Sequence, residues 1–183
     1  SDSNVDGIGL VRTEMLFANN KSYPDEMEQF IAYSKIAKRM NNKPVVIRTV
    51  DVGGDKLFDF FQPVVGSATD SSRGIKCTLR EKERFLTQLR SIIRVGEIGN
   101  IFIAFPMVDS PNEVREAKKL ISKAKHSLLS EGKRIRKRIR TGAFIETKDG
   151  VDNLDSILLE VDFVSLGTND LLQQTMRLDR KNT

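Results

Sequence analysis

Arginines, carboxylates and an asparagine stand at or just beyond the ends of short apolar runs at several places in the chain. They are Arg12, Glu14, Arg48, Asp51, Glu146, Asn169 and Asp170. Guanidinium groups bind phosphate and carboxylate oxygens bidentately. Two carboxylates can hold Mg²⁺, which keeps some waters and takes substrate oxygens as its other ligands. These residue types therefore suit a small polyanion bound with a divalent cation, and phosphoryl transfer, in which catalysis is mainly positioning and charge neutralisation.

Each of these features also has a plainer explanation when it is taken alone. An arginine at a strand end is usually an ordinary salt-bridge partner. Asn169 and Asp170 are typical of a helix cap, and Gly53 and Gly54 of a turn. The two glycines would also let backbone N–H groups approach an oxyanion without a Cβ clash. Only the recurrence of the pattern at successive runs favours one shared site.

The apolar runs predict the strands that would position these residues. The runs lie at residues 7–11, 45–50, 101–105, 143–145 and 163–166. They are rich in Val, Ile and Phe without strict alternation, which is typical of strands buried on both faces. Because the carboxyl ends of parallel strands share one edge, where ligands bind, we expect the charged residues to converge there.

Segments of helical periodicity separate these runs. Apolar residues recur near one face at 27–40, 79–93, 114–128 and 151–158. Pro24 and Pro111 precede the first and third of these segments and can start helices. The segment 57–72 is the exception, and we expect it to be a loop. Alternating strands and helices predict right-handed βαβ units and an α/β fold with a parallel sheet.

The composition fits one globular domain. The chain has 183 residues, of which 39% are hydrophobic and 30% charged, enough for one packed core. No apolar stretch approaches the roughly 20 residues of a membrane helix. A single cysteine, Cys77, leaves no internal disulfide and fits a reducing cytoplasm. With one histidine besides, a structural zinc site is not expected.

A basic run at residues 132–140 leaves two interpretations open. It carries six positive charges, which would suit a nucleic acid bound with steep salt dependence. It has no aromatic platform nearby and no recognisable nucleic-acid-binding module around it. A solvated helix end and connection is therefore the favoured interpretation.

Several motifs, taken in order, resemble the phosphoenolpyruvate-binding barrel of enzyme I of the sugar phosphotransferase system, the phosphoenolpyruvate-protein phosphotransferase family. They lie at residues 7–14, 48–56, 88–94, 105–108, 162–171 and 179–182. Pyruvate phosphate dikinase and phosphoenolpyruvate synthase share the first motif but differ at the second, where Gly-Gly-Asp-Lys at 53–56 favours enzyme I. The resemblance covers nearly the whole chain.

The resemblance implies a partial (β/α)₈ TIM-type barrel, with about six of the eight βα units of the complete fold. Residues 1–183 would form one domain that is incomplete at its C-terminus. It also implies phosphoenolpyruvate as substrate and Mg²⁺ as cofactor. The family passes the phosphoryl group to a histidine of a separate domain and then to a histidine-containing phosphocarrier protein. By family, we expect a cytoplasmic enzyme that forms a homodimer at full length, with no membrane and no nucleic acid as partner.

The matching positions carry the family's residue roles as expectations. Arg12, Arg48 and Arg73 would bind phosphate. Glu146 and Asp170 would be the metal ligands. The remaining substrate-binding positions are Asn169, Arg180 and Lys56, of which the first two would orient the substrate and the third is placed by the Gly-Gly-Asp-Lys motif.

The chain departs from the family pattern in ways that bear on activity. By resemblance, the acid cysteine and the phosphohistidine lie outside this chain, and neither Cys77 nor His126 stands in their place. We therefore expect no catalytic residue in this fragment and no turnover by it alone. Lys148 follows the metal-binding motif where the family has Pro-Ala-Ala, and it would either pair with Glu146 or crowd the site.

Further substitutions concern Ser71 and Ser72, before Arg73, and Gln174 in place of a tyrosine. The alternative function is a non-catalytic anion-binding or regulatory module derived from the same barrel. An open barrel would also expose sheet edges, which favours self-association.

Overall fold

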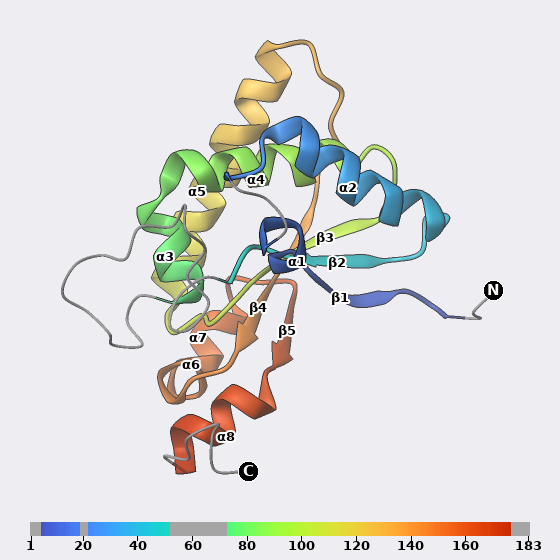
Figure 1. Cartoon of the computed structure of the whole chain (residues 1–183). Coiled ribbons are helices and arrows are strands. Elements are labelled where there is room, and N and C mark those ends of the chain that lie inside the picture. The colour runs from blue at the N-terminus through green and yellow to red at the C-terminus, as the bar shows by residue number, and fades with distance from the viewer. Residues whose placement is uncertain (1–4, 19–21, 52–72, 177–183) are drawn as a thin grey trace.

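The computed structural model describes residues 5–18, 22–51 and 73–176. Their strands form one parallel sheet in which each strand pairs with the next along the chain. The strands are β1 Ile8–Arg12, β2 Val45–Arg48, β3 Ile101–Phe105, β4 Arg140–Ile145 and β5 Phe163–Leu166. Their direction turns steadily from β1 to β5, so the sheet curls (Figure 1). This half-barrel confirms the α/β fold class, and five of the expected strands lie within the described residues.

Helices occupy most of the four segments where the periodicity predicts them, and three further helices, at residues 14–18, 74–80 and 168–176, were not predicted. The helices are α1 Glu14–Ala18, α2 Glu26–Arg39, α3 Gly74–Arg80, α4 Lys82–Val95, α5 Pro111–Ser130, α6 Lys148–Asp152, α7 Leu154–Leu158 and α8 Thr168–Met176. Capping boxes start α2 and α5, at Asp25 and Ser110, as is usual for helix starts of this sequence type. The expected loop at 57–72 lies outside the described residues. No helix within the described ranges is long and apolar enough to cross a membrane.

The long helices α2, α4 and α5 lie together on the outer side of the sheet (Figure 1). Their buried stripes, such as Leu89 and Ile92 of α4, pack with Ile47 and Ile103 of the sheet in one core cluster. The prediction that strands are buried on both faces is correct for most of β2, β3 and β4. It is wrong for β1 and β5, which are partly exposed because they are the edge strands of the described sheet.

The register of the sheet brings the carboxyl ends of all five strands to one edge. Arg12 lies opposite Arg48, Arg48 opposite Ala104, and Ile145 opposite Leu166. The last residues of β1 and β2 and the residues that follow each strand therefore form a common rim, which we call the strand-end rim: residues 12–14, 48–51, 106–109, 146–147 and 167–170.

Candidate functional site

Arg48 lies at the centre of the strand-end rim, with its side chain only 4% exposed. Its Nη2 is 3.3 Å from Oε2 of Glu14 and 3.4 Å from Oδ2 of Asp51. Its Nη1 is 3.6 Å from Oε1 of Glu146, and the guanidinium lies 5.5 Å from the centre of the Phe144 ring. A delocalised guanidinium tolerates burial among several carboxylates better than an ammonium does. Arg48 thus ties together acidic groups from the ends of β1, β2 and β4.

Arg73, at the start of α3, extends this charge array toward β5. Its Nη2 is 3.7 Å from Oδ2 of Asp51, and its Nη1 is 3.6 Å from Oδ1 of Asp170. Asp51 therefore bridges the two arginines. Gly74 follows at φ +59°, a conformation that favours glycine, and the N–H of Ile75 donates to the carbonyl oxygen of Pro106 at 3.0 Å.

Glu146 is held in a confined position between β3 and β5. Its Oε2 accepts a hydrogen bond from the N–H of Met107 at 3.0 Å. A Cβ on Gly167 would lie 2.6 Å from its Oε1, so a larger residue at position 167 would force the Glu146 side chain to move. Burial raises the pKa of Glu146, and the charges of Asp51 and Asp170 add to that rise, while Arg48 and the Met107 N–H oppose it.

The donor chemistry at Glu146 and Asp170 fits a hard divalent cation. Burial, and after it the charges of Asp51 and Asp170, raise the pKa of Glu146, and a positive ion beside Glu146 and Asp170 would stabilise both carboxylates. The described residues contain no group of three His, Cys, Asp or Glu side chains placed to hold a metal. Two carboxylates are sufficient for Mg²⁺, since it retains waters and takes substrate oxygens as further ligands.

Buried polar atoms around the rim are left without hydrogen bonds. Within the described residues these include Nε of Arg48, Nε of Arg73 and Oδ1 of Asp51. Nη2 of Arg48 and Oε2 of Glu14 also lack a hydrogen bond and have ion pairs alone. Most buried polar groups in folded proteins have a partner, and exceptions call for a water, an ion or a ligand. The arrangement can accept an anion on its guanidinium groups and a cation on its carboxylates.

The structure brings together four of the residues that the sequence assigned to the site: Arg48, Arg73, Glu146 and Asp170. Arg12 lies on the same rim, 3.7 Å from Glu14, with 57% of its side chain exposed. Asn169 is exposed at the start of α8. The other two predicted residues, Lys56 and Arg180, lie outside the described residues. The binding roles of all eight stay predictions.

Glu14 and Asp51 are site residues to which the sequence analysis gave no role. Besides pairing with Arg48, Glu14 accepts a hydrogen bond from the N–H of Asp51 at 2.9 Å. This bond joins the ends of β1 and β2. Their position one to three residues beyond two predicted strands had already marked them as candidates, but their pairing with Arg48 could not be read from the sequence.

Gln88 of α4 supports the rim from the helix layer. Fully buried, it accepts a hydrogen bond from the N–H of Val50 at 3.0 Å and donates to Oγ1 of Thr13 at 3.3 Å. It also donates to the hydroxyl of Tyr33 at 3.2 Å. Thr13 in turn donates to the carbonyl oxygen of Arg48 at 3.0 Å. One amide thus sets the ends of β1 and β2 relative to each other.

Three other residues of the sequence analysis can be placed. Lys148 donates to Asp152 at 2.7 Å with 76% of its side chain exposed, so it pairs with Asp152 rather than with Glu146. Cys77 is partly buried, and burial raises the pKa of its thiol. His126 is exposed on α5. Ser71 and Ser72, and the side chain of Gln174, lie outside what the structure describes.

Comparison with known proteins matches the whole chain, residues 1–183, to the family described as "PEP-utilising enzyme, PEP-binding domain", where PEP is phosphoenolpyruvate. The phosphoenolpyruvate-protein phosphotransferase of Bacillus sp. (strain S) is 41% identical over 179 residues, 97% of this chain and 31% of the relative. Those of Bacillus subtilis and Haemophilus influenzae are each 40% identical over 97% of this chain. The chain spans 31% of the length of these relatives.

Proposed function

Since the chain belongs to the family of phosphoenolpyruvate-binding domains of phosphoenolpyruvate-utilising enzymes, we propose that it binds phosphoenolpyruvate together with Mg²⁺ at the strand-end rim. One observation carries the proposal. Arg48, 4% exposed, lies within 3.6 Å of carboxylates from three different strand ends. A buried array of this kind costs desolvation free energy. Binding of an anionic ligand together with a cation would explain why the protein contains it.

The residues divide between the two ligand charges. Arg48 and Arg73 bind the phosphate oxygens, because guanidinium groups form bidentate bonds to phosphate. Glu146 and Asp170 supply oxygen ligands to Mg²⁺, which when bound neutralises charge on the substrate oxygens. Glu14 and Asp51 hold the two arginines in place while no ligand is bound. Arg12, Asn169, Lys56 and Arg180 keep their predicted roles in substrate binding.

The relatives are longer than this chain, which spans 31% of their length. They are named phosphoenolpyruvate-protein phosphotransferases, and we propose that the chain supports Mg²⁺-dependent phosphoryl transfer from phosphoenolpyruvate to a histidine of a separate domain. From there the group would pass to the histidine-containing phosphocarrier protein, which serves sugar transport. The full-length enzyme would be a cytoplasmic homodimer. We expect this chain alone to bind the substrate without turning it over.

Calorimetric titration of the 183-residue chain with phosphoenolpyruvate, with and without Mg²⁺, tests the proposal. We expect binding that depends on Mg²⁺. Asp170→Ala should remove that dependence, and Arg48→Ala should weaken binding by about tenfold or more, since a charge-assisted hydrogen bond contributes roughly 1.5–3 kcal/mol. Arg115→Ala, which breaks an exposed pair with Glu160, is the matched control and should bind as the wild type does.

The titration also separates the proposal from its alternative. Binding of similar strength with and without Mg²⁺ would favour the non-catalytic anion-binding module. No binding of phosphoenolpyruvate under either condition would contradict both.

A further inference from the structure

A polar network centred on Asp109 joins the element that carries Arg73 to the element that carries Glu146. Asp109 follows β3, and its side chain is 15% exposed. Its Oδ2 accepts a hydrogen bond from Nζ of Lys76 in α3. Its Oδ1 accepts one from the hydroxyl of Thr147, at the start of α6. One carboxylate thus contacts both sides of the proposed site.

The two partners of Asp109 stand next to binding residues. Lys76 lies one helical turn after Arg73, and Thr147 is the neighbour of Glu146. Arg73 is not on a strand, so its position depends on how α3 is held. The pairing of Lys76 with Asp109 holds α3 against the loop after β3, where Met107 also donates to Glu146.

The network leaves the Asp109 carboxylate little freedom. Its backbone N–H donates to Glu113 at 2.8 Å, and its carbonyl oxygen accepts from Asn153 at 2.9 Å. The Thr147 oxygen already accepts the N–H of Gly150 at 3.0 Å, so its own proton is available for Asp109. The carboxylate, the backbone N–H and the carbonyl oxygen of Asp109 therefore all have hydrogen-bond partners.

We propose that Asp109 is a positioning residue for phosphoenolpyruvate binding, which through Lys76 and Thr147 sets the distance between Arg73 and Glu146. The proposal rests on the proposed function of the strand-end rim. Asp109 does not touch the ligand; it fixes the two residues that bind the ligand's phosphate and its metal ion.

Three substitutions in the 183-residue chain break the bridge at different points. Asp109→Ala removes the carboxylate, Lys76→Met the α3 side and Thr147→Val the α6 side. We expect each to weaken Mg²⁺-dependent phosphoenolpyruvate binding by about tenfold or more, because a displaced Arg73 or Glu146 loses its charge-assisted bonds to the ligand. Lys76→Arg and Thr147→Ser preserve the donors and should restore most of the affinity.

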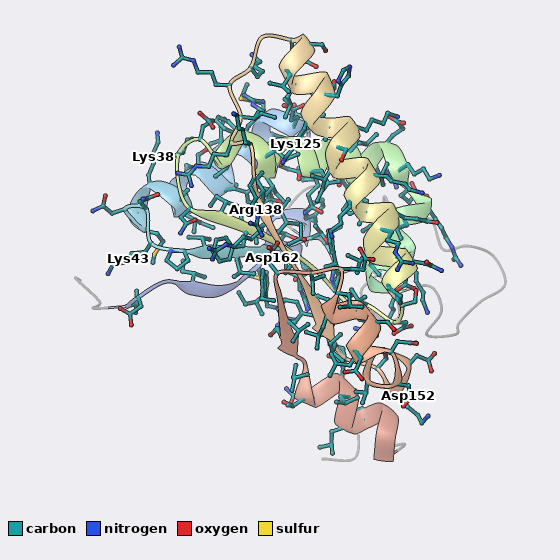
Figure 2. The ribbon with its side chains drawn as sticks, turned by 180° about the vertical axis from the view of Figure 1, so that it is seen from behind. Lys38, Lys43, Lys125, Arg138, Asp152 and Asp162 are labelled. Carbon is teal, nitrogen blue, oxygen red and sulfur yellow. The ribbon has the colours of Figure 1, made fainter. Side chains whose placement is uncertain are left out.

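Asp162 offers a matched control for the loss of a bridging carboxylate. It directly precedes β5, at the amino ends of the strands and away from the strand-end rim. There it accepts hydrogen bonds from Arg138 and from the N–H of Thr141. Figure 2 shows Arg138 and Asp162 close together. Asp162→Ala should lower thermal stability as Asp109→Ala does and leave the affinity unchanged. This contrast separates positioning from a general loss of stability.

The outcomes distinguish the two proposals. If the wild type binds and the three bridge variants bind equally well, the positioning role is overturned and the proposed function stands. If the wild type does not bind, the proposed function fails, and crystal structures of the wild type and Asp109→Ala decide the remaining question. A shift of Arg73 relative to Glu146 supports the bridge, and unchanged positions of both overturn it.

Discussion

At the scale of single residues, Arg48 connects the stability of the rim to its proposed function. Its guanidinium contacts three carboxylates whose side chains are themselves 5–11% exposed. The three carboxylates keep this arrangement only while the Arg48 guanidinium is present, because buried carboxylates without a counter-charge repel one another. A bound phosphate would replace some of these contacts with bonds of the same kind.

Replacing Arg48 by methionine should lower the free energy of unfolding by about 3–5 kcal/mol, since breaking a buried ion pair leaves uncompensated charge. Urea unfolding at pH 7 measures this. Arg48→Lys should recover only part of the loss, because a point charge cannot contact all three carboxylates. Arg115→Met, at an exposed pair, should cost about 1 kcal/mol or less. Equal losses for Arg48→Met and Arg115→Met would contradict the central position of Arg48.

Gly167→Ala should displace the Glu146 carboxylate, because the new Cβ would lie 2.6 Å from Oε1 of Glu146. We expect the Mg²⁺ dependence of phosphoenolpyruvate binding to weaken in calorimetric titration. Gly9→Ala is the matched control, since a Cβ at Gly9 has no atom within 4 Å. A Gly167→Ala variant with wild-type Mg²⁺ dependence would count against Glu146 as a metal ligand.

At the scale of elements, the strand ends and the helix α4 together determine where the rim residues lie. Gln88 is separated from Thr13 by 75 positions in sequence, yet its amide contacts the ends of both β1 and β2. The helix layer therefore does more than cover the sheet. Through Gln88 it sets the position of the end of β1 relative to the end of β2, and these ends carry Arg12, Glu14, Arg48 and Asp51.

Gln88→Leu should lower the free energy of unfolding by about 1–3 kcal/mol, because the N–H of Val50 is left buried without an acceptor. Chemical denaturation measures the change. Thr87→Val, at the partly exposed neighbouring position on α4, should stay within about 0.5 kcal/mol of the wild type. If the two substitutions cost the same, the Gln88 network has no special role in stability.

The sequence allowed the parallel sheet and the convergence of Arg48, Glu146 and Asp170 to be predicted, because parallel strands bring their carboxyl ends to one side of the sheet. The contacts of Gln88 and Asp109 could not be predicted in this way. They depend on side-chain distances between distant elements, which periodicity does not contain. The exposure of the Arg12 side chain could not be predicted either, because an arginine after an apolar run has the same sequence pattern on an edge strand as on a central strand.

At the scale of the whole molecule, the described sheet has two edges. β1 and β5 each pair with one neighbour among the described residues. Apolar side chains near the β5 edge are exposed, including Leu166 at 59% and Leu172 at 54%. Exposed strand edges with apolar side chains favour pairing with another chain.

The 183-residue chain should therefore associate in a concentration-dependent way in sedimentation velocity experiments. Leu166→Lys should shift it toward the monomer, because a charge at a strand edge opposes edge pairing. Leu129→Lys, on α5 with 57% of the side chain exposed, is the control and should have no effect. A wild type that stays monomeric at all concentrations would contradict this prediction.

A crystal structure of the chain with phosphoenolpyruvate and Mn²⁺, a divalent ion with similar oxygen preference, tests the central claim most directly. We predict an anomalous peak at the carboxylates of Glu146 and Asp170, with the phosphate bonded to Arg48 and Arg73. A ligand bound away from the strand-end rim, or a metal ion held by other residues, would contradict the account.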